Sequence, residues 1–414
     1  MPVVLFLIFF LPQAFGTALV NRSQYLNTEV LPDGLWTFGL SHGETSGNNS
    51  SSFGSGGGKV SNQDYFSRDV SYNTLLDEID DPLERELADA AFDVYGVNKN
   101  QNAGNVINDV SVSQKSDAYI FGRGFGKKLS LFAIFPVVTL DMRFTSKFEL
   151  SDSLKELADK LIQDGQYQKA QEILEKSQNA LAQRLQETSY RGDYPGRITT
   201  LANVYLTTRY KALQTGKFNL SSDTSLVVPA GRKSDTRDFL YLRINEEQYS
   251  VRQSLTGSFE PSRRNALLSS VYYHKRFPFE KARRIPMNGV SPISQDIDPN
   301  TNMQYGDSWG TSAQANHLFS DSFLIYAGQS FEIKNRDRIS GGVFSGDRYR
   351  YLEKNSSQSL SISYLGFAYN SISSFLAKKF IIPMDVNVQY SLTQSGKNTF
   401  NNQALTMNLM VFYK

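Results

Sequence analysis

The sequence predicts an all-β protein, a closed antiparallel transmembrane β-barrel of about 12 strands with helical insertions in long extracellular loops. Three observations predict it. Runs of about ten residues alternate apolar and polar side chains, as strands with two different faces do. Aromatic residues make up 13% of the chain, yet the mean hydropathy is only -0.38. The connections between the runs alternate between short and long, as they do in outer-membrane barrels.

The first segment of the chain predicts export. Residues 3–11 are all apolar, and Pro12 and a stretch rich in small residues, 14–18, follow. An apolar stretch of this length is too short to span a bilayer but is typical of a secretory signal, so residues 1–18 are predicted to be a signal peptide. No Lys or Arg precedes Arg22, and a membrane anchor or a misassigned start stays open as an alternative.

Composition excludes several classes of protein. The chain of 414 residues has Cys 0, which excludes disulfides, thiolate metal sites and cysteine nucleophiles. The formal net charge of +2 gives no nucleic-acid footprint.

Period-2 alternation predicts the strands, and the closing hairpin shows it most clearly. Leu405, Met407, Leu409, Val411 and Tyr413 share one face of the last run, which we expect to face lipid and to meet the first strand. The predicted strands lie near residues 34–43, 116–124, 127–139, 197–210, 216–229, 248–260, 265–278, 305–318, 322–335, 357–370, 382–393 and 403–413.

The connections between these strands predict which end faces the cell exterior. Short turns such as residues 214–216 and 320–322 alternate with joins of up to about seventy residues. Short turns lie on the periplasmic rim of such barrels and long loops outside, and an even strand count puts both termini in the periplasm. A soluble β-sandwich is the alternative, but it would not require this alternation.

Two long joins carry structure of their own. Residues 19–115 are predicted to hold the first strand and then a Gly/Ser-rich and helical segment from 44 to 115, which is either an outer loop or a plug. Residues 116–414 form the predicted barrel, with a helical hairpin inserted at 149–192. Ser151 or Ser153 is its expected N-cap and Gly165 its break. We expect this insert to pack on the barrel mouth, with plugging of the lumen as the alternative.

No motif predicts an enzyme or a cofactor. The glycines around Lys59 lack the Ser or Thr of a phosphate loop, and Lys127 replaces the third glycine of a dinucleotide fingerprint, so a linker and a hairpin turn are predicted there. His42, His274 and His317 lie on separate segments without metal-ligand spacing. A weak calcium candidate remains, because oxygen ligands recur in one loop at Asp296, Asp298 and Asn300; a plain polar loop is the simpler interpretation.

The polar faces of the strands supply candidate pore-lining residues. Mixed charge among them predicts selection by size and hydrogen bonding rather than by charge. They are Asn203, Arg209, Asp223, Arg252, Asp385, Asn387, Gln389 and Asn408. Basic residues also crowd the long joins, where they would either pair with lipopolysaccharide phosphates or lie in solvated loops. These are Arg232, Lys233, Arg237, Lys275, Arg276, Lys281, Arg283, Arg284, Arg336, Arg338, Arg348 and Arg350.

Short motifs in residues 116–414 resemble a known family. Residues 124–138, 191–193, 227–231 and 305–307 are similar to outer-membrane barrels associated with meta-pathway phenol degradation, which are distantly similar to long-chain fatty acid transporters. The insert at 149–192 and the long 44–115 segment depart from that family. The resemblance implies passive uptake of small solutes, hydrophobic or aromatic ones among them.

These observations together predict the location and partners of the protein. We expect a monomer in the outer membrane of a Gram-negative cell, in contact with outer-membrane lipid, lipopolysaccharide, the barrel assembly machinery and a small-molecule solute. The alternative function is a surface-exposed anchor for adhesion or envelope structure, without transport.

Overall fold

The structure is a computed structural model, and it describes residues 27–45, 51–61, 68–76, 82–168, 170–171, 197–233, 235–237, 246–286 and 296–414. The predicted signal peptide, residues 1–18, lies outside these ranges. So does most of the second half of the predicted helical hairpin. The predicted division of the chain at residues 18 and 115 stays a prediction.

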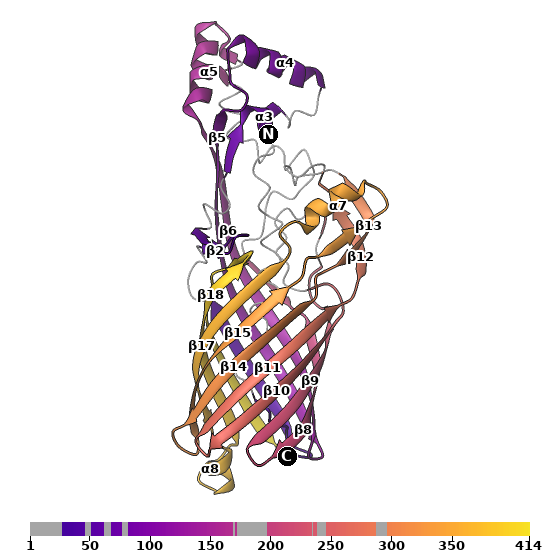
Figure 1. The fold of residues 1–414 in the computed structure, drawn as a ribbon, viewed down its shortest axis with the longest axis vertical. Helices are drawn as coiled ribbons and strands as arrows, with labels where there is room; N and C mark the ends of the chain where they lie inside the picture. Colours follow the sequence, from indigo (N-terminus) through magenta and orange to yellow (C-terminus); the bar gives the residue numbers. More distant parts are fainter. Residues whose placement is uncertain are drawn as a thin grey trace.

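Twelve antiparallel strands close into a barrel (Figure 1), which confirms the predicted fold class and strand number. Each strand overlaps one predicted alternating run. In chain order they are β1 (Trp36–Thr45), β5 (Asn102–Phe125), β6 (Leu129–Leu150), β8 (Val204–Thr215), β9 (Phe218–Val228), β10 (Ser250–Ser262), β11 (Asn265–Arg276), β14 (Ser308–Leu318), β15 (Phe323–Lys334), β17 (Gln358–Asn370), β18 (Met384–Lys397) and β20 (Gln403–Tyr413).

The barrel closes through its first and last strands. β1 pairs with β20 from Trp36↔Tyr413 to Thr45↔Ala404, and on its other edge with β5. Each remaining strand pairs with its neighbour in sequence, and β5 pairs with β6, so no edge of the twelve is left open. The short strand β7 (Arg197–Leu201) continues the line of β8 along β6. The predicted pairing of the last strand with the first is therefore confirmed.

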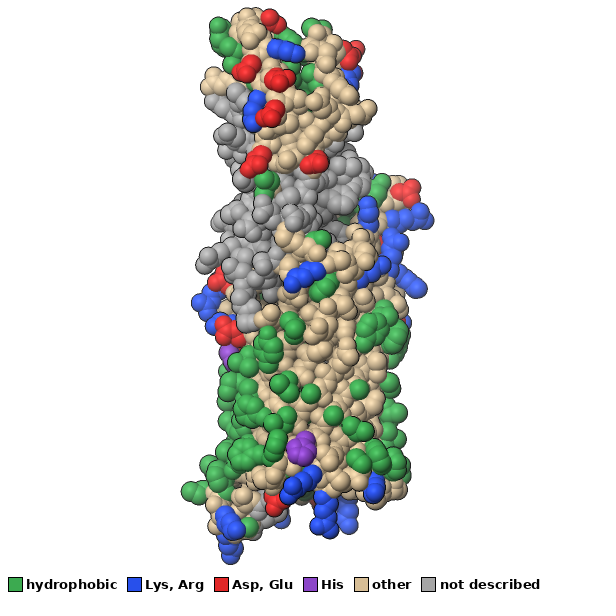
Figure 2. Space-filling view, turned by 60° about the vertical axis from the view of Figure 1, so that its left-hand side comes forward, with side chains coloured by type: hydrophobic (Ala, Val, Ile, Leu, Met, Phe, Trp, Pro, Cys, Tyr) green, Lys and Arg blue, Asp and Glu red, His purple; other side chains and the backbone are tan. Residues whose placement is uncertain are grey.

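The outer wall of the barrel is apolar. On β20 the side chains of Leu405, Met407 and Leu409 are exposed, whereas Ala404 is buried and Asn408 is half-buried. Figure 2 shows hydrophobic side chains spread over the barrel wall. Aromatic rings meet on this outer face near both rims, as in Phe218–Phe259 at 4.8 Å and Trp309–Phe331 at 6.2 Å between ring centroids. Such a belt suits the hydrocarbon layer of a bilayer.

The two rims differ in their connections. At one rim, which we call the short-turn end, two to four residues join β5 to β6, β8 to β9, β10 to β11 and β14 to β15. Gly126 and Gly216 adopt positive φ in two of these turns. The exception is the join of β17 to β18, which contains α8 (Ile372–Leu376) and hangs below the barrel in Figure 1. None of the helices in the described part of the chain has the length and apolar composition of a membrane span.

The opposite rim, the long-loop end, carries a small lobe with its own core. β12 (Phe279–Arg284), β13 (Ile297–Gln304) and β16 (Arg338–Ser340) form a three-stranded sheet beside α7 (Gly346–Glu353). Ile285, Met303, Tyr305, Ile339, Tyr349 and Leu352 are buried between them. A second small sheet at this end joins β2 (Ser51–Phe53), β3 (Lys59–Ser61) and β19 (Thr399–Phe400). The glycines that separate β2 from β3 therefore form a hairpin turn rather than the predicted linker.

Beyond this rim the β5–β6 hairpin continues as a two-stranded ribbon (Figure 1). The pairing of β5 with β6 runs without a register shift from Phe125↔Leu129 to Gly104↔Leu150, whereas β1 covers β5 only as far as Lys115. The prediction ended these strands at residues 116 and 139, and it was wrong there. The strands continue because each finds its hydrogen-bond partner in the other, even where the barrel no longer surrounds them.

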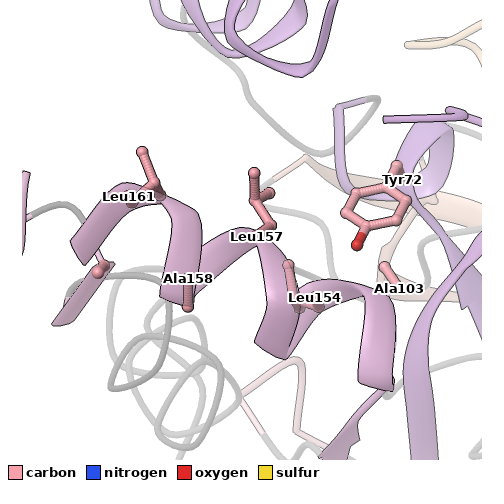
Figure 3. Packing of buried hydrophobic residues seen from close by; sticks show 7 residues of the cluster. Tyr72, Ala103, Leu154, Leu157, Ala158 and Leu161 are labelled. Carbon is pink, nitrogen blue, oxygen red and sulfur yellow. The ribbon is translucent and has the colours of Figure 1, made fainter. Parts of the chain in front are cut away.

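A small helical unit, which we call the head, lies at the tip of this ribbon. It contains β4 (Arg68–Ser71), α3 (Tyr72–Leu76), α4 (Pro82–Val94) and α5 (Asp152–Gln163). Figure 3 shows Leu154, Leu157 and Leu161 of α5 on the side of the helix that faces Tyr72 and Ala103. Ser151 caps α5, and Gly165 at φ 73 follows its end, as predicted. The expected packing of this helix on the barrel mouth is wrong, because its apolar side is buried within the head.

Candidate functional site

The lumen of the barrel is the candidate site, and its wall is mostly polar. Ser250, Ser254, Thr256 and Ser258 of β10 alternate with outward residues such as Leu255. Hydroxyl groups of neighbouring strands bond to each other across this wall, as Thr256 does to Ser270 at 3.0 Å. Alternation alone places these side chains inside, because successive side chains point to opposite faces of a strand and the other face of each strand is turned toward lipid.

The predicted lining residues Asn387, Gln389 and Asn408 come together on β18 and β20. The hydroxyl of Tyr326 on β15 lies 3.0 Å from Oδ1 of Asn387 and 3.4 Å from Oε1 of Gln389. The amide of Asn408 donates to Oδ1 of Asn387 at 3.3 Å. Asn387 and Gln389 are fully buried, whereas Asn408 is half-buried. These three amides and Tyr326 therefore form one hydrogen-bonded patch on the inner wall.

The charged lining candidates are distributed over the wall. Arg209 donates two hydrogen bonds to the carboxylate of Asp223 on the next strand, at 2.8 and 2.9 Å. The guanidinium of Arg252 lies over the ring of Tyr272, 4.0 Å from its centroid. Asp385, near the short-turn end, accepts from the amide of Asn370 at 3.1 Å.

Asn203, the remaining candidate, precedes β8 at the long-loop end, where it is buried and accepts a hydrogen bond from the backbone of Glu246. It lies at the rim rather than along the wall. Arg276 at this end is fully buried and bonds to the carboxylate of Glu246 at 2.7 Å. Because Arg209 and Arg276 are both paired with carboxylates, they give the lumen little net charge.

Four aromatic side chains of the lumen were missed by the sequence interpretation. Each lies directly opposite a glycine in the register of the adjacent strand: Tyr272 opposite Gly310, Tyr326 opposite Gly366, Tyr364 opposite Gly328, and Phe132 opposite Gly122. A Cβ on Gly366 would stand 2.3 Å from the hydroxyl of Tyr326, so only glycine admits the ring. Glycine within a strand signals such close approach, and the glycines of β14, β15 and β17 gave that signal.

The segment before β1 lies inside the barrel at the short-turn end, against the inner wall. The backbone amide of Leu31 donates to the hydroxyl of Ser130 on β6, and the carboxylate of Glu29 binds Lys211 on β8 at 2.7 Å. Thr28 reaches Ser258 on β10 at 3.5 Å. Because β6, β8, β9 and β10 are consecutive strands of the barrel, these contacts place residues 27–33 along this part of the inner wall, where they narrow the opening. Residues 44–115 were left open as an outer loop or a plug, and the described part of that segment lies at the long-loop end and beyond.

The calcium candidate has other partners. Asp296 forms an ion pair with Arg348 at 2.6 Å, and the buried carboxylate of Asp298 accepts a hydrogen bond from the hydroxyl of Tyr349. Burial raises the pKa of Asp298, but the bonds from Tyr349 and from backbone amides, including that of Asn300, outweigh it and keep this pKa below its usual value. Within the described residues no three acidic or histidine side chains are grouped as metal ligands. The calcium site stays a prediction without support from this geometry.

Most basic residues of the long joins lie beside acidic ones. Lys275 binds Asp307 at 2.9 Å, Arg336 binds Glu353 at 3.3 Å and Arg350 binds Asp347 at 3.0 Å. Lys281 pairs with Glu247 and Arg237 with Asp235. Arg284 donates to the backbone carbonyl of Thr236 at 2.6 Å. Pairing of this kind favours the simpler interpretation, solvated and locally neutralised loops, for these side chains.

The fold has a counterpart among solved structures. The COG4313 outer membrane channel from Pseudomonas putida F1 superposes with a TM-score of 0.54 at 10% identity, over 95% of this chain and 100% of that one. This similarity confirms the predicted resemblance at the level of fold. A Pseudomonas aeruginosa FadL homologue aligns over 92% of this chain and 90% of its own, with a TM-score of 0.31 and 8% identity.

The Pseudomonas putida toluene transporter TodX aligns over 92% of this chain and 89% of its own, also with a TM-score of 0.31, at 12% identity. No family model matches the sequence, and neither does any curated protein.

Proposed function

We propose that the protein is an outer-membrane channel through which small solutes, hydrophobic or aromatic ones among them, diffuse passively. One observation carries the proposal: twelve strands close into a wall that is apolar outside and polar inside. A closed barrel satisfies every backbone hydrogen bond of its strands, which is the condition for crossing a bilayer with strands. The core of a soluble protein would be apolar, whereas a polar inner wall is typical of a passage for solutes through a membrane barrel.

The chemistry of the wall supports selection by size and hydrogen bonding. Barrels of eight strands are filled by side chains and those of sixteen or more leave an open aqueous channel, so twelve strands favour a narrow passage. Hydroxyls, amides and the rings of Tyr272 and Phe132 give the wall both hydrogen-bonding and apolar surface. The paired charges of Arg209 and Asp223 favour weak charge selectivity. We assign the protein no catalytic step and no cofactor.

Single-channel conductance in planar bilayers tests this function. Purified, heat-modifiable protein should give discrete current steps and should admit small solutes into liposomes. Ser254→Trp puts a large ring into the lumen, because Ser254 faces inward on β10, and it should lower the conductance. Leu255→Trp, one residue further on, faces outward and should leave conductance unchanged. If correctly folded protein gives no current and no uptake, the channel proposal is contradicted and the surface anchor without transport is favoured.

The anchor remains the second candidate because of the head. A folded unit with its own core, held beyond the rim by the β5–β6 ribbon, is placed to contact another surface. Its presence does not conflict with transport, since the lumen and the head are separate parts of the chain. A surface protein without transport would show the same head but no conductance.

The proposed partners follow from the membrane location. We infer a monomer surrounded by outer-membrane lipid and inserted by the barrel assembly machinery. Lipopolysaccharide phosphates would meet Arg338, an exposed residue of β16 close enough to Lys275 to interact with it electrostatically. Two cations near each other at the outer rim suit a phosphate group, although Asp307 already binds one of them.

A further inference from the structure

One connection at the short-turn end breaks the rule that its neighbours follow. Residues 371–383, which we call the foot, join β17 to β18, where the other joins of this rim take two to four residues. Hydrogen bonds hold the two ends of the foot together. Ser371 is fully buried, its hydroxyl donates to the carbonyl of Ile382 at 2.8 Å, and it accepts from the amide of Met384 at 2.8 Å. An ordered projection therefore stands where the fold needs only a tight turn.

The foot exposes large apolar side chains. Ile381 is 91% exposed and Ile382 48%, and Phe375 and Phe380 are each more than a third exposed. A short connection in water usually carries polar residues, because exposed apolar area is unfavourable there. Four such side chains on one projection require a non-aqueous environment or a partner.

Ring contacts show that the foot adjoins the lipid-facing wall. The ring of Phe380 packs edge-on against Tyr369, with centroids 6.3 Å apart, and Tyr369 lies 4.9 Å from Phe323. Tyr369 follows Leu365 and Phe367 on the outward face of β17, and these two are strongly exposed. The apolar surface of the foot is therefore continuous with the belt. In Figure 2 hydrophobic side chains likewise extend down the wall to the lower edge, where Lys and Arg side chains appear.

Two adjacent cations complete the foot. Lys378 and Lys379 are exposed, and no ion pair joins either of them to another described residue. The backbone amide of Lys378 bonds to the carbonyl of Phe375 and that of Lys379 to Ser374, which fixes both lysines beside α8. Apolar side chains next to lysines are the pattern of segments that lie in the interface of an anionic membrane.

We propose that the foot is an interfacial anchor: Phe380, Ile381 and Ile382 enter the phospholipid leaflet at the short-turn end, and Lys378 and Lys379 bind the phosphates of anionic phospholipid there. Continuity with the belt decides in favour of lipid over a soluble protein partner, because the apolar residues extend the surface that already faces the bilayer. This inference goes beyond the channel function and requires only that the barrel stands in a membrane. The anchor would fix the height of the barrel in the bilayer.

The absence of cysteine from the chain makes the test direct, since a single introduced Cys can be labelled with a nitroxide. Three variants, Ile381→Cys, Leu409→Cys and Asp321→Cys, report the foot, the lipid-facing wall and a short turn of the same rim. The proteins are reconstituted in vesicles of phosphatidylethanolamine and phosphatidylglycerol, and the accessibility of each label to oxygen and to a water-soluble nickel chelate is measured. The label at 381 should favour oxygen several-fold more than the label at 321.

Equal accessibility of the labels at 381 and 321 to the two reagents would overturn the interfacial anchor. So would a label at 381 that is exposed to water in vesicles and becomes shielded only when a soluble partner protein is added. The label at 409 keeps the two proposals apart. If the label at 409 does not report lipid, the membrane barrel itself is contradicted. If the label at 409 reports lipid and the label at 381 reports water, only the interfacial anchor of the foot is contradicted.

The lysines are tested by charge removal in the Ile381→Cys background. Lys378→Gln with Lys379→Gln should abolish any deepening of the label that phosphatidylglycerol causes relative to phosphatidylcholine. Lys127→Gln with Lys128→Gln is the matched control, because these adjacent, exposed lysines lie in the β5–β6 turn of the same rim. An unchanged dependence on phosphatidylglycerol in the Lys378 and Lys379 variant would contradict the phosphate contact.

Discussion

The barrel and the head place their large apolar side chains on opposite sides, outward in the barrel and inward in the head, although the same two strands run through both. In the barrel, β5 turns Tyr119 and Phe121 outward, where they are exposed, and keeps smaller residues such as Ala118 inside. In the head, Ala103 and Leu150 at the far ends of the same hairpin pack inward against the helices. The difference shows that backbone pairing is indifferent to the solvent around it, whereas the placement of apolar side chains follows that solvent.

This contrast explains why the ribbon does not need a break between its two environments. β5 and β6 satisfy each other's backbone groups over their whole paired length, so the ribbon passes from rim to head without a register shift. Only side chains have to change. The head therefore has the side-chain arrangement of a small water-soluble unit, although it is part of a membrane protein. We expect mutations in the head and in the barrel to change the stability of each part independently.

The largest expected effect is in the core of the head. Leu157→Ala removes a side chain that is 3% exposed, and we expect a cost of about 2–5 kcal/mol for opening of the head. Hydrogen exchange of the α3, α4 and α5 amides would measure it, while heat-modifiability of the barrel should not change. Val94→Ala, at a position that is 81% exposed, is the control and should have little effect. Coupled loss of head and barrel stability would show that the two are one cooperative unit.

The reverse expectation holds for the barrel wall. Leu409→Arg places a charge on the lipid face, which should cost about 2–4 kcal/mol near the middle of the bilayer. Asn408→Arg, the adjacent inward residue, should cost less because its side chain enters a polar lumen. Urea titration of each variant in lipid vesicles gives both values. Similar costs for the two neighbours would argue against a lipid-facing outer wall.

The sequence predicted the barrel better than the head for a physical reason. Alternation of two faces is a local signal, and every strand from β8 to β20 shows it through pairs such as Leu409 and Asn408. The ribbon from residue 102 to 115 was missed because alternation within a barrel strand does not show how far its backbone pairing continues beyond the rim. The packing of α5 was also missed, since the helix pattern shows an apolar side but not what that side contacts.

The lumen was predicted in part. Period 2 correctly places Asn387, Gln389 and Asn408 on the same side of neighbouring strands, because the register of a closing hairpin follows from its turn. Their shared partner, Tyr326, lies more than sixty residues away from Asn387 in sequence, on a strand whose register with β17 is not a local property. Likewise the position of residues 27–33 along the inner wall depends on Ser130, Lys211 and Ser258, which no periodicity connects.

A third test extends the comparison to the lobe at the long-loop end, which should obey the rules of the head. Asp298→Asn replaces a carboxylate that accepts bonds from Tyr349 and backbone amides, and it should cost about 1–3 kcal/mol of lobe stability. Because the pKa of Asp298 is lowered in the folded protein, its contribution is present above the unfolded pKa, near about 4, and is lost as pH falls through the folded value. Proteolysis of the lobe should therefore increase in acid, and the variant should lose that pH dependence.

The smallest effect expected is at the cap of α5, where the ribbon becomes the head. The hydroxyl of Ser151 accepts from the backbone amide of Leu154 at 3.1 Å, so Ser151→Ala should cost about 0.5–2 kcal/mol of helix stability. Ser151→Asp keeps an acceptor at the N-cap and should exchange like the wild type. Hydrogen exchange in the first turn of α5 distinguishes these variants. If Ser151→Ala instead loosened β5–β6 pairing below the head, the ribbon and head would have to be treated as one unit, and the independence inferred from their opposite side-chain patterns would not hold.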